Sequence, residues 1–140
     1  MGGITLAGKK MNLLDILDHK HFLVNLFPEG LDKNLMIGQV NFDFLGNTTV
    51  SLHTRQQPAI EVKKWGRWGV QYNVIVVKIS SSIVKKFSAK NISGALYANV
   101  DVQQVENGIR LTQCADDWSF DLVCGYLMFD SCSVYLDEPD

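Results

Sequence analysis

The fold class of this 140-residue chain is decided by one stretch, Leu96-Tyr97-Ala98-Asn99-Val100-Asp101-Val102-Gln103, which leads through Asn107-Gly108 to Ile109-Arg110-Leu111. Its apolar residues fall at every second position on both sides of the Asn-Gly step, which is the period of a β-strand with one buried face. An Asn-Gly step favours a tight two-residue turn because both residues tolerate a positive φ. The stretch therefore predicts an antiparallel β-hairpin.

The residues on either side of this hairpin repeat the period of two. Apolar residues alternate over 40–44, Gly46-Asn47 predicts a second tight turn, and alternation resumes at 50–52. Residues 72–79 are nearly all β-branched and apolar, which is typical of a central strand covered on both faces. Two final strands are predicted at 119–123 and 131–136. A loop with a short strand at 60–63 is predicted over 56–70, and the pattern over 83–87 is ambiguous.

Only the stretch from Asn12 to Phe27 has a helical period, with apolar residues spaced three and four apart. Asn12 is a suitable N-cap, and Pro28-Glu29-Gly30 would end the helix. We therefore expect an α+β fold that is mainly antiparallel β, with one N-terminal helix packed on a sheet or half-sandwich of six or more antiparallel strands. Residues 1–140 are expected to form a single domain, with residues 1–10 disordered or left over from expression.

The charge of the chain is unevenly distributed along the sequence. The formal net charge is −2, but residues 1–91 carry twelve Lys or Arg and six Asp or Glu, whereas residues 92–140 carry one and nine. A general nucleic-acid-binding protein needs concentrated Lys and Arg, so the composition argues against that class. If the acidic third forms one surface, it would attract a basic partner; the alternative is that its carboxylates interleave with basic residues in space.

The sequence also predicts the compartment. Two lysines follow a short apolar patch at the N-terminus, which is the reverse of a secretory signal, and no apolar run is long enough to span a membrane. Three cysteines at 114, 124 and 132 form no paired spacing, so we expect reduced thiols buried on strands. These features favour a cytoplasmic protein with no membrane contact.

No group of residues in the sequence predicts catalysis or metal binding. His19 and His21 stand two apart in the predicted helix and so point to different faces, where they cannot hold one metal ion together. His53 could act with a cysteine, or with Asp116 and Asp117, but no local motif supports either pairing. We therefore expect no enzymatic activity, no cofactor and no metal.

Two segments have the residue types that are common in binding surfaces. Trp65-Gly66-Arg67-Trp68 combines the side chains most enriched at binding hot spots with a glycine-bearing loop. Asp116 and Asp117 suit a tight turn with exposed carboxylates. The residues expected to contact a partner are Trp65, Arg67, Trp68, Asp116, Asp117, Trp118 and Asp121. The alternative for the two tryptophans of the loop is that they close the end of the core.

About two-thirds of the chain resembles the immunity protein 50 family, one of the bacterial families found beside polymorphic toxins. The resemblance is carried by the segments Val50-Ser51-Leu52-His53-Thr54, Tyr72-Asn73-Val74-Ile75-Val76-Val77, Lys90-Asn91-Ile92-Ser93-Gly94, Glu106-Asn107-Gly108-Ile109-Arg110-Leu111 and Phe129-Asp130-Ser131-Cys132-Ser133-Val134-Tyr135. After the predicted helix the family tends to have a Phe-His-Asp-like step, where this chain has Phe27-Pro28-Glu29-Gly30. The resemblance implies a cytoplasmic antidote that binds and blocks a cognate toxin domain and has no enzymatic residues.

Two other expectations stay open at this point. A small-ligand-binding β domain would have its helix over a pocket lined by residues such as Phe42, Phe44, Val74 and Val76. The free edges of an antiparallel sheet would also allow a homodimer by strand addition. For the toxin partner, the C-terminal domain of a neighbouring toxin gene is the expected identity, and a basic domain that acts on nucleic acid would fit the acidic third.

Overall fold

The computed structural model describes residues 10–138. In chain order its helices and strands are β1 (Lys10–Met11), α1 (Leu13–Ile16), β2 (Leu17–Asp18), α2 (His21–Leu26), β3 (Asn34–Phe42), β4 (Thr48–Thr54), the 3-10 helix η2 (Lys63–Trp65), β5 (Val74–Ser81), β6 (Val84–Lys90), the 3-10 helix η3 (Ile92–Gly94), β7 (Ala98–Val105), β8 (Gly108–Ala115), β9 (Trp118–Cys124) and β10 (Leu127–Tyr135). The expectation of disorder for residues 1–10 falls, apart from Lys10, outside the described residues. Lys10 itself pairs with Gln103.

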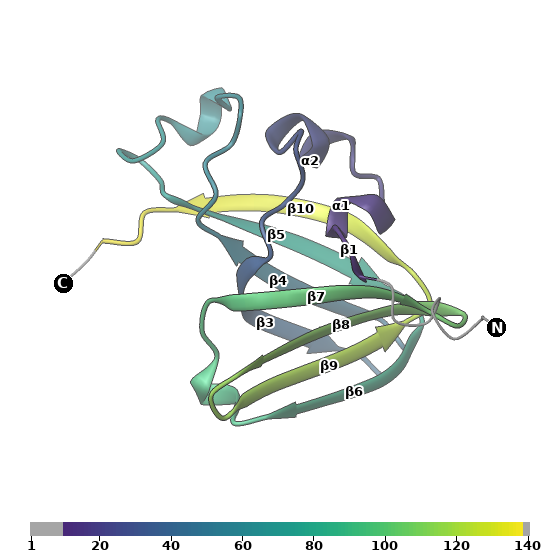
Figure 1. The fold of residues 1–140 in the computed structure, drawn as a ribbon. Helices are drawn as coiled ribbons and strands as arrows, with labels where there is room; N and C mark the ends of the chain where they lie inside the picture. Colours follow the sequence, from purple (N-terminus) through teal and green to yellow (C-terminus); the bar gives the residue numbers. More distant parts are fainter. Residues whose placement is uncertain (1–9, 139–140) are drawn as a thin grey trace.

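The strands form one sheet in the order β2-β10-β5-β4-β3-β7-β8-β9-β6, with β1 added on β7 (Figure 1). The mainly β fold is as the alternation predicts, and β5 lies between β10 and β4 as expected of the apolar run at 72–79. The prediction that this strand is covered on both faces is wrong, because Val76 and Lys78 line an open pocket on its outer face. The prediction of a purely antiparallel sheet is wrong at one pair, because β2 runs parallel to β10.

The sheet curls strongly instead of lying flat. Phe42 on β3 and Phe87 on β6 have ring centroids 4.7 Å apart, although β7, β8 and β9 separate the two strands in the sheet. Right-handed twist accumulating over successive strands brings distant strands together in this way. The core lies inside the curl, where Leu52, Val77 and Leu122 are fully buried.

The hairpins form where the sequence predicts them, but their turns differ in detail. Val105 pairs with Gly108, so the turn residues of the second hairpin are Glu106 and Asn107, and Asn107 adopts a φ of 60°. The first hairpin has a five-residue loop over 43–47 instead of a two-residue turn, because Phe42 and Thr48 are the last paired residues. Within the loop, Asp43 N donates to the carbonyl oxygen of Asn47 (3.1 Å). Residues 60–63 form no strand, and the ambiguous 83–87 lies largely in β6.

The prediction of one helix over 12–27 is wrong. Asn12 caps only the four-residue α1, in a capping box with Asp15, and the chain then extends as β2 and pairs with β10 before α2 begins. The break coincides with His19, which has a φ of 59° that a helix cannot continue through. Pairing with β10 therefore outweighs the local helical period.

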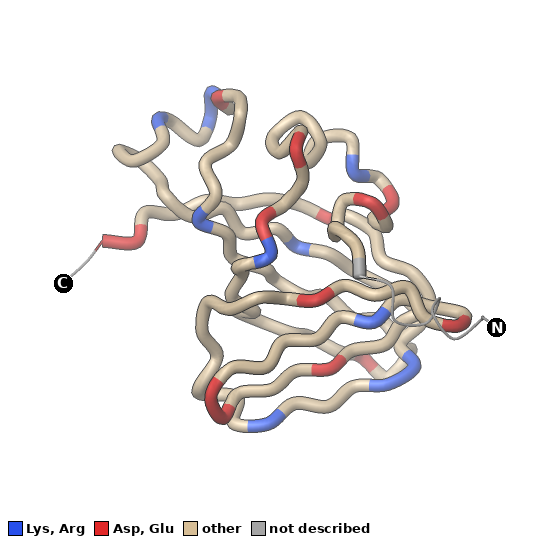
Figure 2. Tube along the Cα trace, viewed as in Figure 1, with Lys and Arg blue, Asp and Glu red and all other residues tan. Residues whose placement is uncertain are grey.

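Basic and acidic residues alternate in space over the lower strands (Figure 2). Arg110 on β8 donates two hydrogen bonds to Asp121 on β9 (3.0 and 2.7 Å), and Nζ of Lys86 on β6 lies 3.9 Å from the same carboxylate. The lysines of β6 thus lie beside the acidic C-terminal third. On this face the charge separation seen along the sequence does not survive folding.

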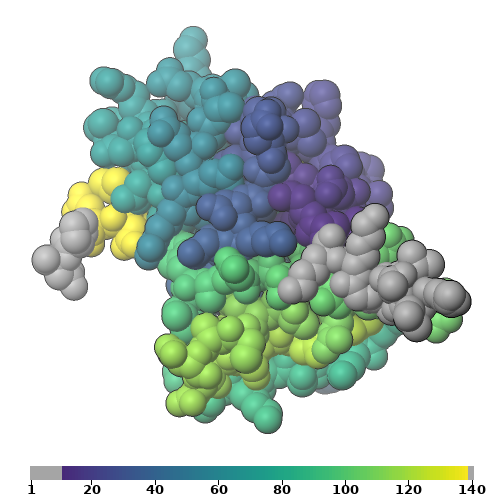
Figure 3. Space-filling model, viewed as in Figure 1, coloured from purple at the N-terminus to yellow at the C-terminus, as the bar shows by residue number. Residues whose placement is uncertain are grey.

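The two short helices and the long segment between β4 and β5 cover the upper side of the sheet (Figures 1 and 3). The ring of Trp65 meets Phe22 and Tyr72 edge-on, with both pairs of centroids 5.8 Å apart. This layer closes the core above β10, β5 and β4. In the part of the chain that the structure describes, no helix is long and apolar enough to cross a membrane.

Candidate protein-binding surface

The edges of β3 and β6 face each other across the opening of the curled sheet, and each is largely unpaired among the described residues. Within the described residues β6 pairs with β9 alone, and β3 pairs with β7 only at Asn34 and Leu35. The rest of β3 is bonded on its β4 side only. An unpaired edge offers a row of backbone donors and acceptors to another chain.

An apolar slot of about 240 Å³ lies between these two edges. Phe42 and Phe87 meet across it, and the ring of Phe87 also packs edge-on against Phe120 with centroids 5.6 Å apart. Both phenylalanines keep a large exposed surface, 44% and 39%. The slot is lined by Ile37, Gly38, Gln39, Val40, Phe42, Phe87, Ala89, Ile92, Ala95, Trp118 and Phe120.

The two loops at one end of the slot extend the apolar surface. Phe44 and Leu45 in the β3–β4 loop are almost fully exposed, and Ile83 in the β5–β6 turn is 49% exposed. The loops touch, because a Cβ on Gly46 would meet the carbonyl oxygen of Ser82. We call the slot together with Phe44, Leu45 and Ile83 the seam.

The β3–β4 loop is held in a defined shape that keeps its apolar side chains outside. The Asp43 carboxylate accepts hydrogen bonds from the backbone of Leu45 (2.8 Å) and from the backbone and side chain of Asn47 (3.0 and 2.9 Å). These bonds, the Asn47 side chain first, lower the pKa of Asp43. The exposure of Phe44 is therefore built into the loop.

The structure places the predicted partner-binding residues in three separate regions. Trp118 lines the seam, and its Nε1 donates to Oε1 of buried Gln113 (2.6 Å). Asp116 and Asp117 form the exposed β8–β9 turn beside it, where Nδ2 of Asn91 donates to the carbonyl oxygen of Asp117 (2.7 Å). These residues lie at the rim of the seam.

The other predicted residues lie elsewhere. Asp121 faces away from the slot, towards Arg110, which holds the pKa of this carboxyl below its usual value. Trp65 is buried and Trp68 is half-buried against Tyr72, so both tryptophans help to close the core, while Arg67 is exposed. No contact in the described structure joins this loop to the β8–β9 turn.

The residues considered for catalysis with His53 do not hydrogen-bond to it in the structure. Nδ1 of His53 hydrogen-bonds the hydroxyl of Tyr135 (2.9 Å), and not a cysteine or Asp116. Cys124 is buried, and burial raises the pKa of half-buried Cys132 to about 12. The expectation of buried thiols is wrong for Cys114, which is exposed. Among the described residues, no group of three or more His, Cys, Asp or Glu is placed to hold a metal ion.

The pocket expected for a small-ligand-binding domain does not form from the expected residues. Phe42 lines the seam, Phe44 stands in solvent, Val74 is buried, and Val76 lies on the outer face of the sheet. No cavity in the described part of the chain is lined by all four side chains.

Sequence reasoning missed most of the seam. Ile83, Phe87 and Ile92 were not singled out, because the β6 segment has no clean alternation and no predicted partner strand. The available signal was the number of large apolar residues between Ile83 and Ile92 in a segment that also holds three lysines. Such a segment suits an edge strand with one apolar face.

Comparison with known proteins gives no relative: no family model matches the chain, and no curated protein or solved structure is significantly similar to it.

Proposed function

We propose that this chain is a cytoplasmic bacterial immunity protein, which binds a cognate toxin C-terminal domain and blocks it without chemistry of its own. Its resemblance to the immunity protein 50 family supports this proposal, together with the seam. The chain would act by covering the active-site surface of the toxin domain.

The observation that carries the proposal is the seam, an apolar slot bordered by an unpaired strand edge. A contiguous exposed apolar patch with a polar rim often marks a protein interface. An extended segment of the toxin domain would pair its backbone with the free edge of β6. Its apolar side chains would enter the slot against Phe42 and Phe87.

The charges around the seam favour a toxin domain over a second copy of this chain. Lys85, Lys86 and Lys90 all lie on β6. Two β6 edges pairing with each other would place lysines opposite lysines, and like charges across strands are destabilising. Lys85 Nζ already donates to the carbonyl oxygen of Asn107 (2.7 Å), and Lys86 Nζ lies 3.9 Å from Asp121. A carboxylate beside the incoming strand would therefore meet Lys90, and basic residues of the toxin would meet Asp116 and Asp117.

The test is binding to the C-terminal domain of the toxin-like protein encoded next to this chain. We expect a stable complex whose dissociation constant is measured by titration calorimetry, and protection of cells that express the toxin domain. Phe44→Asp and Ile92→Asp change exposed seam residues, so each should weaken binding by about tenfold or more while leaving the melting temperature unchanged. Val70→Asp, at an apolar residue outside the seam that is 54% exposed, is the control.

Two outcomes would contradict the proposal in different ways. The absence of a complex at micromolar concentrations would refute the immunity function. A complex that tolerates both seam variants but is lost in Arg67→Ala would keep the function and move the interface to the Trp65–Trp68 loop. Raising the salt concentration separates the charged rim from the apolar slot, because salt screens only the rim.

A further inference from the structure

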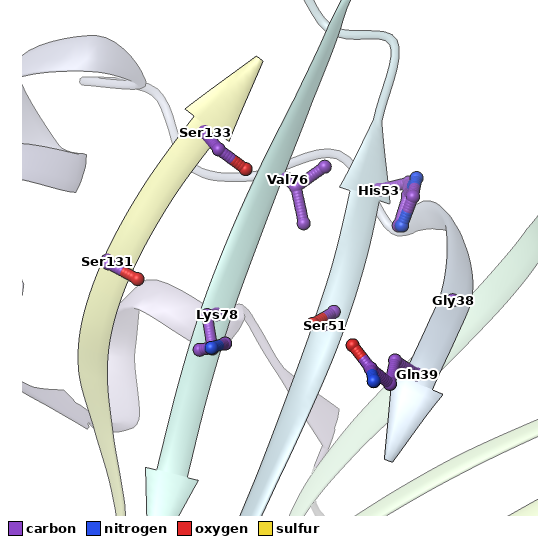
Figure 4. A pocket seen from close by; sticks show the side chains of 8 residues that line it. All are labelled: Gly38, Gln39, Ser51, His53, Val76, Lys78, Ser131 and Ser133. Carbon is purple, nitrogen blue, oxygen red and sulfur yellow. The ribbon is translucent and has the colours of Figure 1, made fainter. Parts of the chain in front are cut away.

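A second cavity lies on the outer face of the sheet, where β3, β4, β5 and β10 carry their polar side chains (Figure 4). Its volume is about 570 Å³. We call it the trough; it is lined by Gly38, Gln39, Ser51, His53, Val76, Lys78, Ser131 and Ser133. No Asp or Glu is among these residues.

Lys78 lies at the centre of the trough. Strand register places Ser51 of β4 on one side of it and Ser131 of β10 on the other, and Figure 4 shows both hydroxyls directed towards Lys78. The lysine is half-buried, and within the described residues its ammonium group has no hydrogen-bond or ion-pair partner. The stem of the lysine is packed on the sheet, and its ammonium group is therefore available to an anion that enters the trough.

Ser51 is the second polar group of the trough that is available to a ligand. The residue is only 7% exposed, and its hydroxyl has no hydrogen-bond partner among the described residues. Its oxygen is not among the fully buried atoms without a partner, so the hydroxyl opens to the trough and can donate to a group that enters there.

One end of the trough is held rigid. The hydrogen bond between Nδ1 of His53 and the hydroxyl of Tyr135 fixes the imidazole ring. Gly38 makes room for the ring, since a Cβ at this position would overlap Nε2. The β-bulge at Gly38 then turns Gln39 so that it lines the trough beside Ser51.

We propose that the trough binds a tetrahedral oxyanion, such as a phosphate group. Lys78 would supply the positive charge, and the hydroxyls of Ser51, Ser131 and Ser133 and the amide of Gln39 would donate hydrogen bonds around it. Donors that converge on one cation from three strands suit a group with several acceptor oxygens better than a planar carboxylate. The site goes beyond the toxin-blocking function and needs no protein partner.

The test uses the isolated protein and NMR titration of its backbone amides with sodium phosphate, sodium sulfate and sodium acetate at matched ionic strength. We expect phosphate and sulfate to shift the amides of residues 51, 78 and 131 with saturation, and acetate to bind clearly more weakly. Lys78→Met should weaken phosphate binding by about tenfold or more, and Ser51→Ala by about threefold. Lys64→Met, at an exposed lysine on η2, should bind as the wild type does.

Adenosine monophosphate distinguishes the two sources of the phosphate group. Binding at least about tenfold tighter than that of inorganic phosphate would assign the trough to a phosphomonoester, and equal binding would assign it to the free ion. Three results would overturn the proposal: no saturable shift near the trough, acetate binding as tightly as phosphate, or unchanged affinity in both Lys78→Met and Ser51→Ala. The serine variant decides the question if the lysine variant fails to fold.

Discussion

Gly38 is a residue whose missing side chain decides the local structure, because the imidazole of His53 occupies the space of its Cβ. Gly38→Ala would force the ring away from Tyr135 and should lower the free energy of unfolding by about 1–3 kcal/mol. Urea denaturation measures this loss. Gly94→Ala is the matched control, since a Cβ there meets nothing within 4 Å, and should change stability by less than about 0.5 kcal/mol.

A double variant shows whether overlap with the His53 ring causes this loss of stability. In a His53→Ala background, Gly38→Ala should cost much less than it does alone, because the overlapping ring is gone. An equal cost in both backgrounds would contradict the account of this contact.

Gln113 joins three strands through one buried side chain. Its Nε2 donates to the carbonyl oxygens of Leu35 (2.8 Å) and Ala98 (2.9 Å), and its Oε1 accepts from Trp118. Gln113→Leu leaves these buried groups unsatisfied and should lower the free energy of unfolding by about 2–4 kcal/mol in urea denaturation. A loss no larger than that of Gln104→Leu, at an exposed position of β7, would show that this network contributes little.

At the scale of elements, the β8–β9 hairpin carries a pH-dependent contribution to stability. Hydrogen bonds from Arg110 lower the pKa of Asp121 from its ordinary value of 3.8. The unfolded carboxyl therefore takes up its proton at a higher pH than the folded one, so the stabilisation is fully present well above pH 3.8 and is lost as the pH falls through the lower folded value.

Asp121→Asn should accordingly reduce the free energy of unfolding at pH 7, and the difference from the wild type should shrink only below pH 3.8. Arg110 is 40% exposed, so solvent screening limits the loss to about 0.5–1 kcal/mol. The check is urea denaturation across this pH range. The interpretation fails if Asp117→Asn, in the exposed turn, produces the same loss with the same pH dependence.

The edge strand β6 should also differ from the central strand β5 in its dynamics. β5 is bonded to neighbours on both sides, whereas β6 is bonded on one side only within the described residues. Amide hydrogen exchange followed by NMR should therefore show faster exchange in β6, through local opening, than in β5. Equal protection in the two strands would mean that the edge is already covered.

The elements also show how far sequence reasoning reaches. Alternation and turn residues predict the hairpins well, because strand period and turn chemistry are local properties. The N-terminal helix was predicted wrongly because Leu17 and Asp18 pair with residues 110 positions further along the chain. A helical period cannot reveal such a long-range partner.

At the scale of the whole molecule, the curl of the sheet creates the seam, because it brings Phe42 to Phe87. The trough depends on strand register instead, which places Ser51 and Ser131 on either side of Lys78. Of the predicted partner-binding residues, Trp118 and the Asp116–Asp117 turn lie at the seam, while Trp65 and Trp68 pack on the core side. The remaining seam residues could not be predicted, because they meet only after three intervening strands have twisted.

Hydrogen exchange of the free protein and of the protein mixed with its proposed partner, a toxin domain, tests the central claim most directly. If the toxin adds a strand at the seam, the amides of β6 and of residues 43–47 should become protected in the complex, while those of residues 57–72 should keep their exchange rates. Protection confined to residues 57–72, with β6 exchanging as fast as in the free protein, would contradict the account.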